Sequence, residues 1–179
     1  AATGDKVVKI GVFEPASGDN GAGGKQEALG VQYANTVQPT VEIGGETYKV
    51  ELVYSDNGSD PAKAVSAAST LVSANVALVL GSYGSGVSVA ASDTFKDAGL
   101  AAIGVTCTNP KVTVGNDHYF RICFLDPFQG TVLANYAFEE LKAKTAYCLS
   151  ELGDEYGQGL VTFFKEAFEA AGGKVITDS

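Results

Sequence analysis

Residues 76–86 read VALVLGSYGSG, which is a run of five apolar residues followed by a loop of glycine, serine and tyrosine. A run this short and this uniformly apolar predicts a β-strand buried on both faces, as in a parallel sheet covered by helices. The loop at residues 81–86 leads into a segment with the apolar spacing of a helix, and Gly99 is placed to end that helix in a left-handed conformation. The stretch therefore predicts one strand-loop-helix unit of an α/β protein.

The same alternation extends in both directions along the chain. Upstream, the pattern predicts strands at residues 7–13 and 48–54, a hairpin turn at Gly44-Gly45, and helices at residues 25–36 and about 60–75. Downstream, it predicts strands at 100–105, 119–124, 146–149 and 174–177, and helices at 128–144 and 155–171. Repeated βαβ units of this kind predict a doubly wound, flavodoxin-like parallel sheet with helices on both faces.

Composition excludes several classes of partner. The 179 residues carry a formal net charge of −9 with only 12 lysines and arginines, so no basic surface is expected for nucleic acid or for an anionic membrane. No apolar run approaches the roughly 20 residues that span a bilayer. Residues 1–6 are small and polar, as in a mature N-terminus after leader removal. The three cysteines lack the spacing of a zinc or redox motif, and at least one is expected to be an unpaired, buried thiol.

Motifs for catalysis are missing or incomplete. His118 has no nucleophile in a recognisable motif, and neither Ser82 nor Ser85 has glycines two residues before and two residues after it, as a nucleophile elbow requires. Residues 18–26 match neither the P-loop nor the dinucleotide fingerprint. Both motifs require a residue other than glutamine at the position of Gln26. Asp56, Asn57 and Asp60 lack a loop of calcium-binding length and a closing glutamate, and they are interpreted as a turn and a helix cap. We expect no enzyme activity, no cofactor and no metal.

Ligands of open parallel sheets bind beyond the carboxyl ends of the strands, where four loops are expected: residues 17–24, 81–86, 106–109 and 153–157. Gly84 and Ser85 open a helix whose free N–H groups favour a carboxylate, although the glycines alone are equally consistent with a tight turn. Thr106 and Thr108 could turn a hydroxyl and a carbonyl toward an ammonium group, or simply end a strand. Tyr156 could cap a ligand, or pack at the start of its helix.

Six short motifs, spread over nearly the whole chain, resemble the leucine/isoleucine/valine-binding group of type I periplasmic binding proteins. The motifs are KIGV at 9–12, DPAKA at 60–64, ASD at 91–93, FR at 120–121, QG at 129–130 and YGQG at 156–159. This resemblance implies a two-lobed Venus-flytrap receptor of an amino-acid ABC importer, located in the periplasm or on the cell surface as a lipoprotein. It also implies an amino-acid ligand, branched-chain or small aliphatic, and an ABC permease as partner.

Carried over to this sequence, the resemblance assigns the ligand carboxylate to Ser85 and its neighbour Gly84. It assigns the amino group to Thr106 and Thr108, and it brings Tyr156 to the ligand from the second lobe. The family often has an aromatic residue in the first loop, where this chain has Gly23. The side-chain end of the pocket is therefore expected to be more open than in the family.

The resemblance also divides the chain. Residues 1–122 are expected to form the first lobe without its C-terminal return segment, residues 123–127 the crossover, with Cys123 and Asp126 as hinge residues, and residues 128–179 an incomplete second lobe. Exposed lobe surfaces would then favour a homodimer, and amino-acid affinity would be weak or absent. Two alternatives stay open: a ligand-sensing receptor domain of the same fold, and a nucleotide-using flavodoxin-like enzyme.

Overall fold

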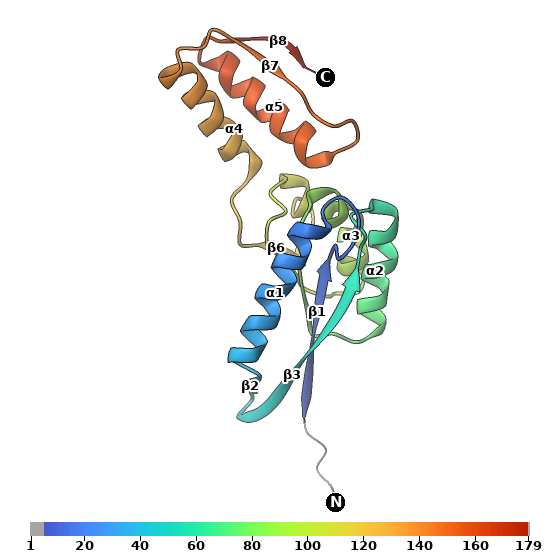
Figure 1. Ribbon diagram of the computed structural model, residues 1–179. Helices are drawn as coiled ribbons and strands as arrows, with labels where there is room; N and C mark the ends of the chain where they lie inside the picture. The colour runs from blue at the N-terminus through green and yellow to red at the C-terminus, as the bar shows by residue number, and fades with distance from the viewer. Residues whose placement is uncertain (1–5, 179) are drawn as a thin grey trace, which may run out of the picture. The chain divides into compact units, whose positions relative to one another are not determined.

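A computed structural model describes residues 6–178 of the chain as an α/β protein (Figure 1). Contacts divide it into a first unit, which runs to Cys107 and includes Val112–Ile122, and a second unit made of Thr108–Lys111 and the chain from Cys123 onward. The first unit contains β1 (Val7–Glu14), α1 (Gly21–Val37), β2 (Thr40–Ile43), β3 (Glu46–Asp56), α2 (Pro61–Ser73), β4 (Leu78–Leu80), α3 (Ser85–Asp97), β5 (Ala102–Gly104) and β6 (Tyr119–Arg121). The second contains α4 (Asp126–Asn135), β7 (Thr145–Cys148), α5 (Glu155–Ala170) and β8 (Lys174–Asp178).

The first unit is built on a six-stranded sheet of order β2-β3-β1-β4-β5-β6. Strand β1 pairs in parallel with both β3 and β4, and β4, β5 and β6 continue the parallel ladder. Only β2 is antiparallel, because the tight turn at Gly44-Gly45 folds it back onto β3. The predicted doubly wound, mostly parallel sheet is confirmed.

The main core lies where α2 and α3 cover one face of the sheet. Alternate residues of β1 point to this face, so Phe13 packs edge-on against Phe95 of α3 with ring centroids 5.5 Å apart. Tyr119 of β6 extends the aromatic cluster at 6.1 Å from Phe95. Helix α2 adds a stripe of small residues and Leu71, whose side chain is fully buried. These contacts fix the strands whose ends carry the loops.

The opposite face of the sheet is covered by α1 (Figure 1) and keeps an apolar hollow of about 510 Å³. The hollow is lined mainly by β-strand residues such as Ile10, Leu52 and Ile103, and by Val31 of α1. Helix α1 buries little of its own surface, since only Gly21 and Gly24 are buried. Helix α1 therefore contributes little buried apolar surface to the first unit.

The second unit is a small parallel pair, β7 and β8, associated with α4 and α5. The two helices approach closely at Gly130, where an added Cβ would lie 2.7 Å from Cβ of Phe163. Phe168 of α5 is fully buried and stacks on Phe164 with centroids 5.3 Å apart. Beyond Asn135, α4 continues as one wider π-type turn, Tyr136–Glu140.

Two helices begin earlier than the sequence predicts. Helix α1 starts at Gly21 rather than at Lys25, so Gly23 lies on a helix and not in a loop. Glycine has poor helix propensity, but here a side chain would not fit: a Cβ on Gly24 would lie 2.2 Å from the carbonyl oxygen of Pro15. Helix α4 starts at Asp126, which was expected in the crossover, because Pro127 suits a first helical turn.

No helix among residues 6–178 is both long enough and apolar enough to cross a membrane. Residues 1–5, which were interpreted as a mature N-terminus, lie outside the described part of the chain. Cys107 and Cys148 are buried thiols, and Cys123 is half-buried.

Removal of the Leu71 side chain should reveal how much the α2 face stabilises the first unit. Leu71→Ala leaves a cavity in a fully buried position, so we expect the free energy of unfolding to fall by about 2–5 kcal/mol in urea titration. Leu29→Ala, on the exposed side of α1, is the matched control and should change it by less than about 0.5 kcal/mol. Equal losses in the two variants would contradict this placement of the core.

Candidate functional site

The loops expected to bind ligand in the first unit all leave the carboxyl edge of the same sheet. Strands β1, β4 and β5 are neighbours and parallel, so the segments after Glu14, Leu80 and Gly104 emerge side by side. This arrangement brings together the Gly23 region, Gly84-Ser85 and Thr106 within one unit. The sequence placed each of these loops directly after a strand of a parallel sheet, which is the basis on which they were expected to lie at one edge.

Helix α3 begins at this edge with Ser85, and its N-cap is Gly84. Gly84 has φ +106°, a backbone conformation that residues with a side chain rarely adopt, and it has no side chain with which to cap the helix. Ser85 is 2% exposed, and Ser88 donates a hydrogen bond to the Gly84 carbonyl oxygen at 2.9 Å. The helix therefore directs its first-turn N–H groups and dipole toward the loop edge, the geometry that attracts anions.

Tyr83 lies directly over Gly23. A Cβ placed on Gly23 would be 2.6 Å from Cε2 of Tyr83 and 2.7 Å from its Cζ, so the ring occupies the space that a side chain at position 23 would need. The expectation of a more open pocket at Gly23 is therefore wrong at this point. An aromatic ring is present, but it comes from the loop after β4 instead of from the first loop.

Asp56 organises the loop after β1 from the end of the neighbouring strand β3. Its carboxylate accepts hydrogen bonds from the amides of Ala16 and Gly58, at 2.7 and 2.8 Å, and from the Ser17 hydroxyl at 2.7 Å. Partial burial opposes ionisation, but these three donors together lower the pKa of Asp56. Asp60 caps α2 through the Ala62 amide at 2.8 Å. The interpretation of this acidic segment as a turn and a cap is confirmed.

Two glutamates that the sequence reasoning did not select lie behind the loops. The Glu14 carboxylate accepts the Tyr83 amide at 2.7 Å, and Glu27 accepts the Thr106 hydroxyl at 2.5 Å. Glu14 is 4% exposed, and burial, followed by its hydrogen bond to Glu27 and the charge of Glu27, raises its pKa to about 9. The available signal was an acidic residue at the buried end of a mainly apolar strand.

Thr108 falls in the second unit although Thr106 belongs to the first. The Asp126 amide donates to the Thr108 carbonyl oxygen at 3.1 Å, which ties this loop to the start of α4. The Thr108 side chain is 6% exposed, and no described residue hydrogen-bonds its hydroxyl oxygen. Asp126, one of the two predicted hinge residues, is fully buried.

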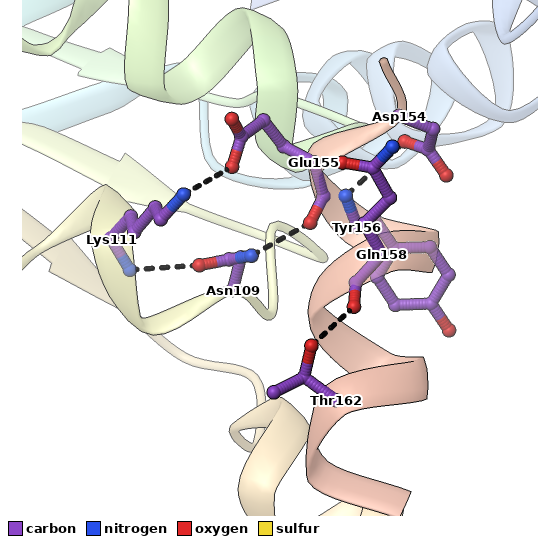
Figure 2. A network of polar contacts seen from close by, with 7 residues as sticks. All are labelled: Asn109, Lys111, Asp154, Glu155, Tyr156, Gln158 and Thr162. Carbon is purple, nitrogen blue, oxygen red and sulfur yellow. Dashed lines mark hydrogen bonds and ion pairs between the residues drawn. The ribbon is translucent and has the colours of Figure 1, made fainter. Parts of the chain in front are cut away.

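Helix α5 presents Tyr156 in its first turn (Figure 2). Asp154 caps the helix by accepting the Tyr156 and Gly157 amides at 3.2 and 2.8 Å. The Tyr156 hydroxyl accepts a hydrogen bond from the side-chain amide of Gln129 at 2.9 Å. Tyr156 remains 36% exposed, so its ring is both oriented and accessible.

The loop residues Asn109 and Lys111 hold this helix start (Figure 2). Asn109 donates to the Glu155 carbonyl oxygen at 2.8 Å and accepts the Lys111 amide at 2.9 Å. The Lys111 ammonium forms an ion pair with the Glu155 carboxylate, also at 2.8 Å. A four-residue segment of the loop after β5 is thus fastened to α5.

The predicted ligand-binding residues consequently fall into two sets. Gly23, Gly84, Ser85 and Thr106 lie in the first unit, whereas Thr108 and Tyr156, together with Cys123 and Asp126, lie in the second. The His118 ring contacts the neighbouring Asp117 carboxylate at 2.9 Å, and its backbone amide donates to the Asn116 side chain at 2.8 Å. Within residues 6–178, no group of three or more His, Cys, Asp or Glu side chains is arranged to hold a metal.

The profile of a family described as periplasmic binding protein matches residues 7–179. This chain belongs to that family. The binding protein is 33% identical over 167 residues to a Leu/Ile/Val-binding protein homolog of Brucella melitensis, and 38% identical over 156 residues to an amino acid binding protein of Pseudomonas aeruginosa. The family consists of substrate-binding proteins of transporters and not of enzymes.

Solved structures agree with this assignment. The binding protein matches a leucine-binding protein from Thermotoga maritima with a TM-score of 0.91 and 33% identity, covering 97% of this chain and 48% of that one. It matches a branched-chain amino-acid binding protein from Streptococcus pneumoniae, solved with isoleucine, with a TM-score of 0.84 and 31% identity, covering 97% and 49%. The two relatives named above are covered over 45% and 41% of their lengths, against 92% and 86% of this chain. The chain therefore spans about half the length of these relatives.

Asn109 should contribute more to the second unit of the binding protein than Lys111 does. Asn109→Ala leaves the Glu155 carbonyl without its buried donor, so we expect a loss of about 1–3 kcal/mol in unfolding free energy. Lys111→Met removes an exposed ion pair and should cost under about 1 kcal/mol. Hydrogen exchange at the first amides of α5 would report the difference, and faster exchange in the lysine variant than in the asparagine variant would contradict it.

Proposed function

We propose that this chain is the N-terminal half of an extracytoplasmic solute-binding protein that captures an amino acid, branched-chain or small aliphatic, for an ABC importer. One observation carries the proposal: helix α3 opens with Gly84-Ser85 at the carboxyl edge of the sheet, next to the Thr106 loop, in a chain of the periplasmic binding protein family. Relatives named for amino-acid binding support the choice of ligand class.

In the proposed complex, the ligand carboxylate lies against the first-turn amides of α3 at Gly84 and Ser85. Because the Thr106 hydroxyl is already directed to Glu27, we assign the Thr106 carbonyl to the ligand ammonium. The Thr108 hydroxyl, buried and without a described partner, supplies a second polar contact. Tyr156 reaches the ligand from the second lobe, and Tyr83 supplies the aromatic wall at Gly23.

In this proposal, the rest of the ligand site is formed by residues of a longer protein that are not part of this chain. We propose that residues 1–122 form the first lobe, that residues 123–127 form a crossover, and that residues 128–179 begin the second lobe. The half-length match to the relatives supports this division, and so does the apolar hollow beside α1. Closure of two complete lobes around the ligand would then favour docking on the permease. Association of this chain with a second copy through its exposed lobe surfaces belongs to the same proposal.

Two alternatives to amino-acid transport can be tested: binding of an aromatic acid, and ligand sensing without a permease. A solved neighbour from Rhodopseudomonas palustris, 26% identical with a TM-score of 0.81, binds 4-hydroxybenzoate, so an aromatic acid is the second candidate ligand. A carboxylate at Gly84-Ser85 is common to both ligands, whereas only an amino acid uses Thr106 and Thr108. A sensory receptor domain of the same fold would bind the same ligands without a permease.

Amide chemical shifts of the chain, followed by NMR, test the proposal directly. We expect millimolar L-leucine, isoleucine, valine or alanine to shift the amides of Gly84, Ser85 and Thr106, with leucinamide, which lacks the carboxylate, giving no shift at α3. We expect weak affinity, because the chain spans about half the length of its relatives. Larger shifts with 4-hydroxybenzoate would favour the aromatic-acid alternative, and no shift with any of these compounds would refute the site.

Ser85→Ala should weaken this binding about tenfold, which corresponds to one hydrogen bond of about 1.4 kcal/mol. Ser66→Ala is a matched control, because Ser66 is exposed on α2 and its hydroxyl donates only to the Lys63 carbonyl of its own helix. The same titrations measure both variants. Unchanged binding in Ser85→Ala would remove this side chain from the site, and submicromolar affinity of the wild-type chain would contradict the proposal that half of the site is missing.

A further inference from the structure

The carboxyl groups of Glu14 and Glu27 meet behind the proposed binding loops. Glu14 ends β1 and is 4% exposed, and Glu27 projects from the second turn of α1. The two carboxyl groups lie within reach of a hydrogen bond, and Oε1 of Glu14 and Oε2 of Glu27 are buried with no N–H or hydroxyl donor from any described residue. A hydrogen bond between two carboxyl groups requires a proton on one of them.

The remaining oxygens of the pair reach the two loops that follow β4 and β5. Oε2 of Glu14 accepts the Tyr83 amide at 2.7 Å, and Oε1 of Glu27 accepts the Thr106 hydroxyl at 2.5 Å. The pair therefore joins four segments: the end of β1, helix α1, the loop that leads to Gly84-Ser85, and the loop that contains Thr106. Through these two contacts, one pair of side chains holds both Tyr83 and Thr106.

No cation compensates a second negative charge at this point. Neither glutamate forms an ion pair with a lysine or arginine of the described residues. Two titratable groups face Glu14 from other elements: the Glu27 carboxyl of α1 and the Tyr119 phenol of β6. The Cys107 thiol and Arg121 lie near the Tyr119 phenol. Arg121 donates to the Cys107 carbonyl and to Thr113, and Asp56 of β3 accepts from the first loop.

We propose that Glu14 and Glu27 share one proton, and that this protonated pair positions the Tyr83 and Thr106 loops for ligand binding. The two glutamates are positioning residues, and neither contacts the ligand. The effect of this pair on ligand binding rests on the proposed function, whereas the existence of the shared proton does not. Loss of the proton leaves the buried Glu14 carboxylate beside the half-buried Glu27 carboxylate, and their repulsion separates β1 from α1 and releases both loops.

The sign of the pH effect follows from the raised pKa of Glu14. The unfolded carboxyl ionises near 4.5, whereas the folded one keeps its proton to about pH 9. Between these values the native chain binds one proton more than the unfolded chain, so its stability falls as pH rises. One proton corresponds to a tenfold rise in the unfolding equilibrium constant for each pH unit across this window, and the effect levels off above about pH 9.

The decisive variant is Glu14→Gln, which retains an oxygen for the Tyr83 amide and offers an NH₂ donor to Glu27 at every pH. We expect the ratio of the wild-type unfolding constant to that of the variant to rise by up to tenfold per pH unit from pH 5 to 9. Glu51→Gln, an exposed position on β3, is the control and should follow the wild type. Parallel profiles of Glu14→Gln and the wild type would overturn the proposal.

A second measurement needs no variant. The Glu14 carboxyl carbon of the wild-type chain, followed by ¹³C NMR, should titrate well above pH 7, and the Tyr83 and Thr106 amide shifts should move with the same midpoint. A Glu14 titration near 4.5 would exclude the shared proton. Titration above pH 7 with unmoved Tyr83 and Thr106 amides would exclude the positioning role.

Leucine titrations at pH 6 and pH 9.5 then separate this inference from the proposed function. We expect amide shifts induced by leucine at pH 6 to be lost at pH 9.5 in the wild type and retained in Glu14→Gln. If the carboxyl titrates as expected but no amino acid shifts any amide at either pH, the proposed function fails and the shared proton stands. Equal leucine affinity at both pH values would overturn the coupling to binding.

Discussion

The parallel pairing of β1 between β3 and β4 is the constraint on which the rest of the first unit depends. It aligns the carboxyl ends of three strands, so that the Asp56 turn, the Pro15 loop and the Gly84-Ser85 helix start share one edge. Main-chain hydrogen bonds set this register, and the packing of Phe13 against Phe95 holds the helix that follows. Polar loops then lie together without any covalent or metal link.

Two carboxyl groups near that edge, those of Asp56 and Glu14, have different surroundings and different protonation. Asp56 is exposed to several donors and remains an ordinary carboxylate that organises a turn. Glu14 is buried beside a second carboxyl group, so its protonated form is favoured over a second negative charge at the same place. Two acidic residues at the ends of adjacent strands thus have opposite pKa shifts, because one has hydrogen-bond donors around it and the other has mainly apolar surroundings and a like charge.

Most of the fold could be predicted from the spacing of apolar residues and from turn and cap residues. The apolar run at 76–80, the Asp60-Pro61 start and Gly99 each have one good local structure, and all three are found where expected. The start of α1 could not be predicted this way, since Gly21, Gly23 and Gly24 favour a loop by propensity. Tertiary contacts require glycine at two of these positions, because Tyr83 and Pro15 approach Gly23 and Gly24 too closely for a side chain.

Sequence alone determined the family, the alternation of strands and helices, and the position of Ser85 at a helix start, because these depend on local spacing and on short motifs. Tertiary structure alone decided that Tyr83 covers Gly23, that Glu27 reaches Glu14, and that Asn109 bonds to α5 rather than to the strand that precedes it. These contacts join residues from 13 to 60 positions apart, and nothing in local propensity specifies which distant side chains meet.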